Sequence, residues 1–135
     1  MTLRAGLPAD LPRLLAIRDA AGADALSDPR RIGEPMLRRR LGTGDVAVWQ
    51  EDGAVCGFVA VDGATLHLLV DSAARGQGIG RALLAEGCRR LAERGTRTAS
   101  LSLPPAGTAE PHYRVAGWRP ATGSAGAARR LQKPL

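Results

Sequence analysis

The chain is poor in aromatic residues, cysteine and histidine. Of its 135 residues, four are aromatic, two are cysteines and two are histidines. A nucleic-acid surface combines clustered basic residues with stacking aromatics, and here the basic residues are scattered. Cys56 and Cys88 form no C-x-x-C pair and have no histidine at metal-ligand spacing, so they are expected to be reduced core residues. We therefore expect neither a metal nor a nucleic-acid partner.

Long apolar runs are also missing. No stretch approaches the roughly 18 apolar residues of a membrane-spanning helix, and no secretory leader is visible. We therefore expect a cytoplasmic protein without membrane contact. The length suits one domain over residues 1–135 with a sizeable core, and it does not indicate whether the protein is a monomer or a homodimer. Arginine carries nearly all of the positive charge behind the net +6, which favours contacts with phosphate or carboxylate.

The chain does contain three closely spaced glycines between a predicted strand and a predicted helix. Residues 70–84 place an apolar strand before Gly76, Gly78 and Gly80, and a helix directly after them. Unpaired backbone N–H groups at a helix start bind anions, and glycine lets a ligand approach them closely. The dinucleotide fingerprint needs glycine where Arg81 stands, and the P-loop needs a final Gly-Lys-Ser/Thr, so neither motif fits. The run is either a phosphate cradle of another kind or a tight turn.

Hydrophobic periodicity predicts a mixed α/β order along the chain. Asp-Gly turns near residues 53 and 63 indicate antiparallel hairpins, and the helix after the glycine run should return the chain to a parallel strand. Thr108 or Gly107 is expected to cap a short helix through Arg114. The predicted strands are 2–5, 46–49, 54–61, 65–70, 98–103, 118–122 and 127–133, with longer helices over 8–21, 34–41 and from 79 to Gly95.

Four segments together resemble the GNAT acetyltransferase superfamily. The glycine run is similar to its acyl-coenzyme A loop, Arg/Gln-x-x-Gly-x-Gly/Ala. The other matches are the family's usual opening, its third strand and its late Ala-x-x-x-Tyr-x-x-x-Gly-Phe segment. In this chain the four segments are Arg75-x-x-Gly78-x-Gly80, Thr2-Leu3-Arg4 with Pro8-Ala9-Asp10-Leu11, Val55 to Val59, and Ala109-x-x-x-Tyr113-x-x-x-Gly117-Trp118.

The resemblance implies a single GNAT domain with a mixed sheet of about six to seven strands, about four flanking helices and splayed parallel strands. It implies an N-acetyltransferase that uses acetyl-CoA, with direct attack of a small-molecule or peptide amine through a tetrahedral intermediate. Pantetheine would lie between strands 65–70 and 99–103. The implied cofactor-binding residues are Leu68, Leu69, Val70, Arg75, Gly76, Gln77, Gly78, Ile79, Gly80, Arg81 and Thr108.

The catalytic residues are less completely matched. Tyr113 falls at the family's general-acid position, although a buried core tyrosine is the alternative interpretation. Ala106 stands where the family often has an Asn that contacts pantetheine, and Thr108 is its expected replacement. Ala64 and Thr65 stand where a Glu often helps to deprotonate the amine.

His67 is a candidate base, because a histidine has an ordinary pKa of about 6.5 and this one lies on the strand next to the expected thioester. The alternative is that His67 has only a structural role. Glu110 and His112 are further candidates. The incomplete match keeps a second hypothesis open, a non-catalytic acyl-CoA-binding sensor or interaction module. The acceptor site is expected from residues 19–41 and 118–133. Their arginines suit an acidic acceptor or form a solvated surface, and they include Arg30, Arg31, Arg38 and Arg129.

Overall fold

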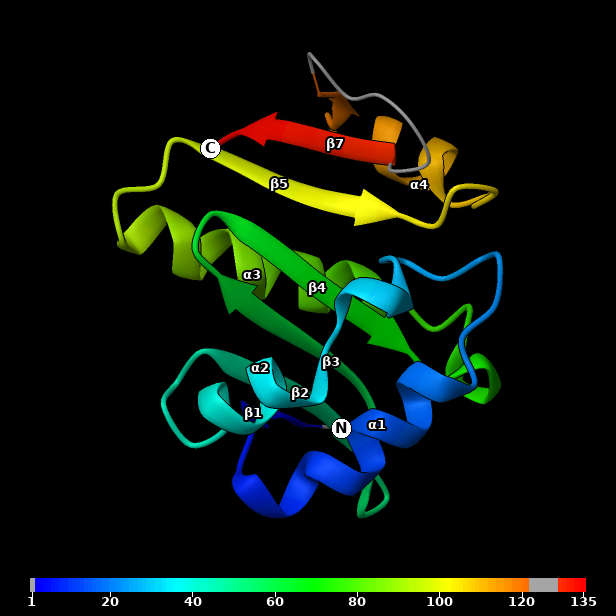
Figure 1. Ribbon diagram of the computed structural model, residues 1–135, viewed down its shortest axis with the longest axis vertical. Coiled ribbons are helices and arrows are strands. Elements are labelled where there is room, and N and C mark those ends of the chain that lie inside the picture. The colour runs from blue at the N-terminus through cyan, green and yellow to red at the C-terminus, as the bar shows by residue number, and fades with distance from the viewer. Residues whose placement is uncertain (1, 122–128) are drawn as a thin grey trace.

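The computed structural model describes residues 2–121 and 129–135, and its centre is a mixed seven-stranded sheet (Figure 1). This confirms the expected sheet. Neighbouring strands are antiparallel except β4 and β5, which are parallel. In sheet order the strands are β1 (Thr2–Ala5), β2 (Val46–Glu51), β3 (Ala54–Asp62), β4 (Thr65–Val70), β5 (Thr98–Leu103), β7 (Arg129–Pro134) and β6 (Arg119–Pro120).

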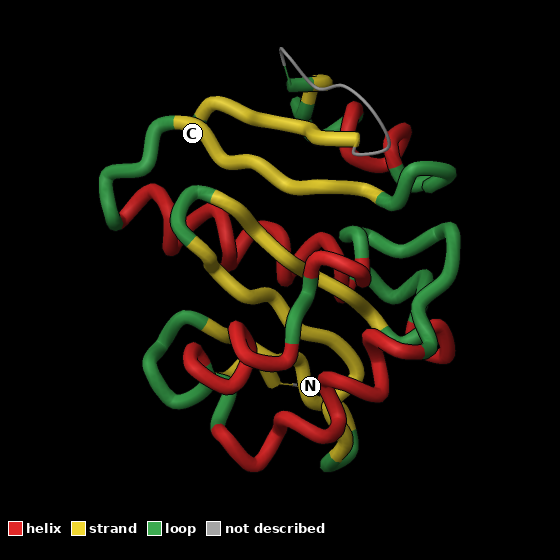
Figure 2. Tube along the Cα trace, in the orientation of Figure 1, coloured by secondary structure: helices red, strands yellow, loops and turns green. Residues whose placement is uncertain are grey.

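Helices cover both faces of the sheet. Figures 1 and 2 show α1 (Leu11–Asp19) and α2 (Glu34–Arg40) on one face and α3 (Ile79–Glu93) on the other. The short α4 (Glu110–Arg114) follows β5 and buries Tyr113 in the same core cluster as α3. Short 3-10 turns precede α1, α2 and α3: η1 (Pro8–Asp10), η2 (Pro29–Arg31) and η3 (Ser72–Ala74).

The cap of α4 differs from the prediction. The N-cap residue is Ala109, rather than Thr108 or Gly107, and it makes no side-chain capping bond. The Gly107 amide closes the preceding turn by donating to the Pro104 carbonyl, and the Thr108 amide donates to the Ala23 carbonyl in a distant segment. The helix therefore begins one residue later than a cap at Thr108 would place it, directly after a residue bonded to a segment 85 positions away.

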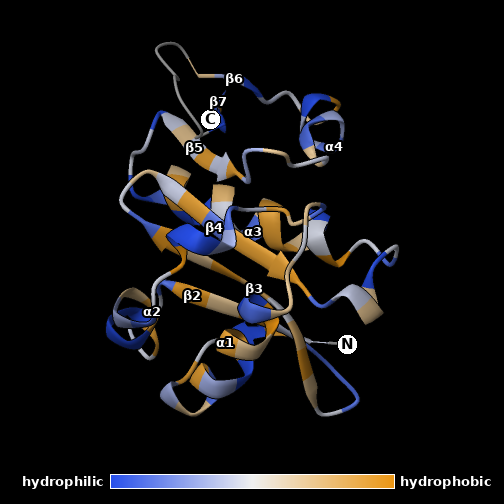
Figure 3. Ribbon diagram, turned by 45° about the vertical axis from the view of Figure 1, so that its right-hand side comes forward, coloured by the Kyte–Doolittle hydropathy of each residue, from blue (hydrophilic) through white to orange (hydrophobic). Residues whose placement is uncertain are grey.

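The sheet separates two apolar clusters, and Figure 3 shows apolar residues concentrated on its strands. Because side chains alternate along a strand, Leu66 and Leu68 of β4 pack under α3, while Leu69 packs under α1 and α2. Cys56 and Cys88 are both free, the first buried and the second packed against the α3 cluster. None of the helices among the described residues is long and apolar enough to cross a membrane.

The predicted hairpins are confirmed, and the C-terminal strands show one further detail. β2, β3 and β4 form consecutive antiparallel pairs, with Gly53 and Gly63 in left-handed turns. β7 pairs with both β5 and β6 and so lies between them, which places the last strand inside the sheet. The connection between the predicted strands 118–122 and 127–133 lies outside the described residues.

Candidate active site

The turn between β4 and α3 has a backbone that glycine alone adopts without strain. Gly76 and Gly78 each have a φ of +80°, and Gly78 is the N-cap of α3. Gly80 is needed for a different reason, because a Cβ atom there would lie 2.6 Å from Cδ1 of Leu26. The local structure therefore accounts for all three glycines of the predicted loop.

A pocket of about 330 Å³ lies against this turn. The first amides of a helix have no acceptor within the helix, and α3 continues for 15 residues from this point. The free amides and the positive end of the helix dipole suit a phosphate group. Of the predicted loop residues, all but the exposed Gln77 line the pocket, namely Arg75, Gly76, Gly78, Ile79, Gly80 and Arg81.

Arg75 extends from this turn to the loop between α1 and α2. Its guanidinium forms an ion pair with the Asp24 carboxylate, and its Nη1 donates a 3.2 Å hydrogen bond to the Asp24 carbonyl. Its Nε is buried and has no hydrogen-bond partner within the described part of the chain. Arg81 is exposed where it lines the pocket. The turn thus places a guanidinium with an unsatisfied donor beside the pocket.

β4 and β5 separate as they approach this pocket. Their only registered pair is Thr65 with Ser100, whose hydroxyl groups lie 3.0 Å apart, and Figure 1 shows the two arrows diverging toward their heads. Beyond that pair, the loop between α1 and α2 bridges the strands. The Leu68 amide donates to Oγ of Ser27 at 3.0 Å, and the Asp28 amide donates to the Ser102 carbonyl at 2.7 Å.

Tyr113 also contacts this loop. Its side chain is fully buried, its hydroxyl donates a 2.6 Å hydrogen bond to the Leu26 carbonyl, and burial raises its pKa. The Thr108 amide donates to the Ala23 carbonyl at 3.0 Å. Four residues predicted to bind or act on an acyl-CoA therefore contact residues 23–27. Together with Asp28, residues 23–27 are called the bridging loop. The contacting groups are the Leu68 amide, the Arg75 guanidinium, the Tyr113 hydroxyl and the Thr108 amide, although the predicted contact of Thr108 was through its side chain.

The remaining predicted backbone contacts lie at the end of β4. Leu69 pairs with Phe58 of β3, and Val70 pairs with Gly57. Since backbone groups alternate in direction along an antiparallel pair, the amide of Val70 points to the same side as that of Leu68, toward β5. Val70 also lines the pocket beside the glycine turn, so the end of β4 joins that pocket to the separated strands.

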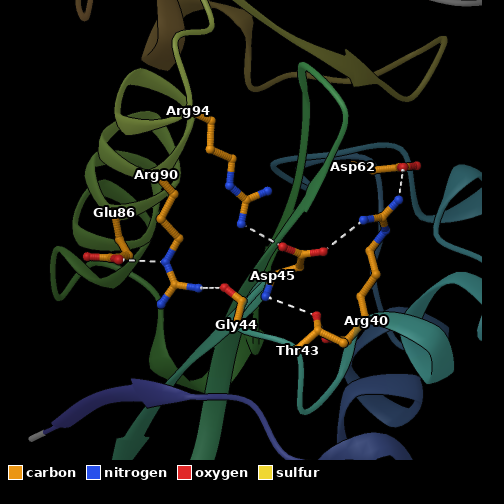
Figure 4. Close-up of polar contacts among 8 residues, drawn as sticks. All are labelled: Arg40, Thr43, Gly44, Asp45, Asp62, Glu86, Arg90 and Arg94. Atoms are coloured by element: carbon orange, nitrogen blue, oxygen red, sulfur yellow. Dashed lines mark hydrogen bonds and ion pairs between the residues drawn. The ribbon is translucent and has the colours of Figure 1, made fainter.

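His67 is buried on the other face of the sheet from Leu66 and Leu68. Its Nε2 lies 3.8 Å from Oδ2 of Asp62. Burial lowers its pKa below the ordinary 6.5, and the nearby Asp62 opposes that shift only in part. Arg40 donates to Asp62 at 2.6 Å and to Asp45 at 2.9 Å, and Figure 4 shows it reaching both carboxylates. His67 is thus uncharged near neutral pH beside a carboxylate that is held in place.

Glu110 and His112 lie in different surroundings. Glu110 forms ion pairs with Arg114 and Arg129, which lower its pKa and tie α4 to β7. His112 lines the pocket beside the glycine turn. The described residues contain no group of three or more side chains arranged to hold a metal ion.

Sequence reasoning missed the contribution of the bridging loop. Ser27 and Asp28 are almost fully buried, yet the sequence there reads only as a polar turn before Pro29. The one signal in the sequence was the Asp28-Pro29 pair, which favours an Asx-type turn. The structure confirms that turn, because the Asp28 side chain accepts a hydrogen bond from the Arg30 amide. That pattern predicts the turn and says nothing of its insertion between two strands.

Comparison with known proteins identifies the family. The sequence pattern of the acetyltransferase (GNAT) domain matches residues 42–120, which run from the end of α2 to β6 and include the glycine turn. The chain belongs to the GNAT acetyltransferase family. A mycothiol acetyltransferase from Beutenbergia cavernae is 38% identical over 69 residues, covering 50% of this chain and 22% of that protein. This GNAT chain therefore spans about a fifth of the length of that curated relative.

Solved structures confirm the GNAT fold. A ribosomal-protein-alanine N-acetyltransferase from Brucella melitensis has 25% identity and a TM-score of 0.73, covering 100% of both chains. A phosphinothricin acetyltransferase from Sinorhizobium meliloti in complex with AcCoA has 26% identity and a TM-score of 0.73, covering 99% of this chain and 88% of that one. The PaiA N-acetyltransferase from Thermoplasma acidophilum in complex with coenzyme A shares the fold, with 14% identity, a TM-score of 0.75, and coverage of 99% and 98%.

Proposed function

We propose that this GNAT protein transfers an acetyl group from acetyl-CoA to a primary amine. The observation that carries the proposal is the pocket at the start of α3, which includes Val70 at the end of β4, where β4 no longer pairs with β5. A helix N-terminus suits a pyrophosphate, and separated strands leave backbone groups for an extended amide-bearing arm. Similar structures from Sinorhizobium meliloti and Thermoplasma acidophilum contain AcCoA and coenzyme A, which supports this donor.

The residues around the turn fit the donor chemically. The amides from Gly76 to Gly80 and the guanidinium groups of Arg75 and Arg81 would bind the pyrophosphate. An anion at the helix N-terminus is stabilised by up to about 2 kcal/mol in a partly buried site. The amides of Leu68 and Val70 would bind the pantetheine arm and the thioester carbonyl oxygen. The Leu68 amide would then lose its hydrogen bond to Ser27 and donate to acetyl-CoA instead. We therefore expect the bridging loop to leave the gap between β4 and β5 when acetyl-CoA binds.

Two proton transfers accompany the reaction. The amine nitrogen attacks the thioester carbonyl carbon, a C–N bond forms, and the C–S bond breaks with its electron pair going to sulfur. A lysine-like amine with a pKa of about 10.4 must first lose a proton, and His67 would accept it at a ring nitrogen. The Tyr113 hydroxyl would donate a proton to the leaving thiolate, with a conjugate-acid pKa of about 8.5. The Leu68 amide would stabilise the negative charge on the carbonyl oxygen.

The deciding experiment is an acetylation screen with purified protein and acetyl-CoA. Free amino acids, polyamines, aminoglycosides and peptide N-termini are the acceptors, and both thiol release and the acetylated product are measured. We expect thiol release that depends on one class of amine. Donor binding without amine-dependent thiol release would replace the transferase by a binding module, and absence of donor binding would overturn the proposed site altogether.

A pair of glycine variants tests the donor site itself. Gly78 and Gly53 have φ values of +80° and +79°, and at neither would a Cβ atom meet another atom within 4 Å. Substitution by alanine imposes the same backbone strain at both, so Gly53→Ala is the matched control for Gly78→Ala. We expect Gly78→Ala to weaken coenzyme A binding by about 10-fold or more and Gly53→Ala to leave it unchanged, as measured by calorimetric titration.

A further inference from the structure

A second hollow, of about 440 Å³, lies on the face of the sheet that carries α1 and α2. It is lined by polar and charged side chains from four separate parts of the chain. Strand alternation explains their common direction, since the neighbouring Leu66, Leu101 and Leu131 all point into the opposite cluster under α3. The lining residues are Arg31, Asp62, Thr65, His67, Ser102 and Arg130.

The position of the hollow follows from the strands that separate. Thr65 and His67 belong to β4, and Ser102 belongs to β5, so the hollow opens over the gap between these strands. His67 is the residue next to Leu68, whose amide faces that gap. A molecule in this hollow therefore lies across the sheet from α3 and next to the place where the thioester would be.

Most arginines of the expected acceptor region already have acidic partners. Arg30 takes both carboxylate oxygens of Asp28 at 3.1 Å. Arg38 pairs with Glu34, Arg40 pairs with Asp45 and Asp62, and Arg129 pairs with Glu110. These guanidinium groups already form ion pairs with carboxylates. A substrate anion would therefore bind to other arginines.

Arg31 and Arg130 are different. The Nε of Arg31 lies 3.9 Å from a carboxylate oxygen of Asp28 that Arg30 already contacts, and no ion pair of Arg130 is found within the described residues. The acid in the hollow, Asp62, is paired with Arg40. The hollow therefore has two guanidinium groups with little or no neutralisation, above a histidine that burial keeps uncharged.

We infer that this hollow binds the carboxylate of a small acceptor amine through Arg31 and Arg130, with the amine beside His67. The inference rests on the proposed function and names the substrate class for it. A planar guanidinium binds a carboxylate through two parallel hydrogen bonds, which fixes the substrate's orientation as well as its charge. Arg130 stands directly across from Ser102 in the β5–β7 register, so it is anchored by a strand beside the gap.

The experiment compares α-amino acids with their carboxamides, which keep the amine and lose the carboxylate. We expect kcat/KM to be at least 10-fold higher for the acids. Arg130→Ala should remove that preference by raising KM for the acids, Arg130→Lys should retain part of it, and both should leave the Kd of coenzyme A within two-fold. Arg38→Ala is the control, since Arg38 is an exposed arginine paired with Glu34 outside the hollow.

Binding of the same amino acids to the protein saturated with coenzyme A is measured separately by ligand-detected NMR. Binding that requires Arg130, with no acetyl transfer to any amine, would retain the hollow and overturn the proposed function. Equal use of acids and carboxamides, or an acid preference that survives Arg130→Ala, would overturn the inference and leave the proposed function standing.

Discussion

At the scale of single residues, burial decides how His67 and Tyr113 hold their protons. Burial disfavours the charged form of each group, so the pKa of His67 falls and that of Tyr113 rises. The histidine is therefore uncharged and can accept a proton near neutral pH, and the tyrosine stays protonated there. Under the proposed function, the uncharged His67 would accept a proton and the protonated Tyr113 would donate one.

For His67 the prediction concerns pH. Because protonation removes the base, activity should be lost as the pH falls through its folded-state pKa, which lies below 6.5. We expect His67→Gln to lower kcat/KM by about 100-fold and to abolish this acidic limb. The comparison is made with one acceptor from pH 5 to pH 9, so that titration of the amine is common to both proteins. The same additional loss below pH 6.5 in His67→Gln would assign that loss to another group.

For Tyr113 the prediction separates chemistry from binding. Tyr113→Phe removes the proton donor and the 2.6 Å hydrogen bond to the Leu26 carbonyl, with the ring retained against Trp118. We expect kcat to fall by roughly 10- to 1000-fold while the Kd of coenzyme A does not increase. Steady-state kinetics and calorimetric titration measure the two quantities. A kcat equal to that of the parent protein would leave Tyr113 with the role of holding the loop.

At the scale of elements, the bridging loop connects the residues that are proposed to bind or act on acetyl-CoA. Its contacts with β4, the glycine turn, Thr108 and Tyr113 join residues 41 to 87 positions apart in sequence. Under the proposed function these contacts and the donor compete for the same groups. The measured affinity for the donor then depends on the fraction of protein in which the loop has left the gap.

Ser27→Ala tests this competition. It removes the acceptor of the Leu68 amide, and a hydrogen bond of about 0.5–1.5 kcal/mol corresponds to a coenzyme A affinity tighter by roughly 2- to 10-fold. Thr43→Ala, which removes a hydroxyl that donates to the Arg40 carbonyl far from the gap, should leave the affinity unchanged.

Hydrogen exchange supplies a second readout of the same event. The amides of Asp28 and Thr108 donate to Ser102 and Ala23, so both should exchange faster when coenzyme A is bound. Slower exchange at both amides, together with weaker binding by Ser27→Ala, would mean that the loop stays in place as a wall of the donor site.

The local sequence pattern predicted most helices and strands correctly, but it did not predict the contacts between segments that are distant in sequence. β4, the glycine turn and α3 follow from alternation, left-handed glycine positions and helical spacing, which are properties of adjacent residues. The burial of Ser27 and the pairing of Asp62 with Arg40 depend on segments that meet only in the folded chain. The predicted start of α4 was also wrong, at a place where the Thr108 amide is bonded to Ala23 in a distant segment.

At the scale of the whole molecule, one charged network joins the α2 side of the sheet to α3. Asp45, directly before β2, accepts hydrogen bonds from Arg40 and Arg94, and Figure 4 shows the two arginines approaching it from opposite sides. Nearby, Arg90 joins Glu86 of α3 to the Gly44 carbonyl. Asp45 therefore connects both helical layers, and through Arg40 it also holds Asp62 beside His67.

Asp45→Ala should lower the free energy of unfolding by about 1–3 kcal/mol, since two arginines lose a partly buried partner. Burial opposes ionisation of Asp45, but its arginine partners lower its pKa overall, so its contribution is present above the ordinary value of 3.8 and is lost as the pH falls below it.

Urea denaturation at pH 7 and pH 3 measures both effects. The difference between Asp45→Ala and the parent protein should shrink at the lower pH. Glu93→Ala removes an exposed partner of Arg89 and should change stability by less than about 0.5 kcal/mol. A loss for Asp45→Ala as small as that of Glu93→Ala would show that the network does not stabilise the fold.

The single registered pair between β4 and β5 has a mechanical consequence. On one side of it lie β1 to β4, and on the other lie β5, β7 and β6, so the sheet consists of two parts joined along this seam. Whatever occupies the seam acts as an additional strand, whether it is the bridging loop or the arm of a donor. The stiffness of the whole sheet, and its resistance to heat, should then rise with the concentration of acetyl-CoA around it.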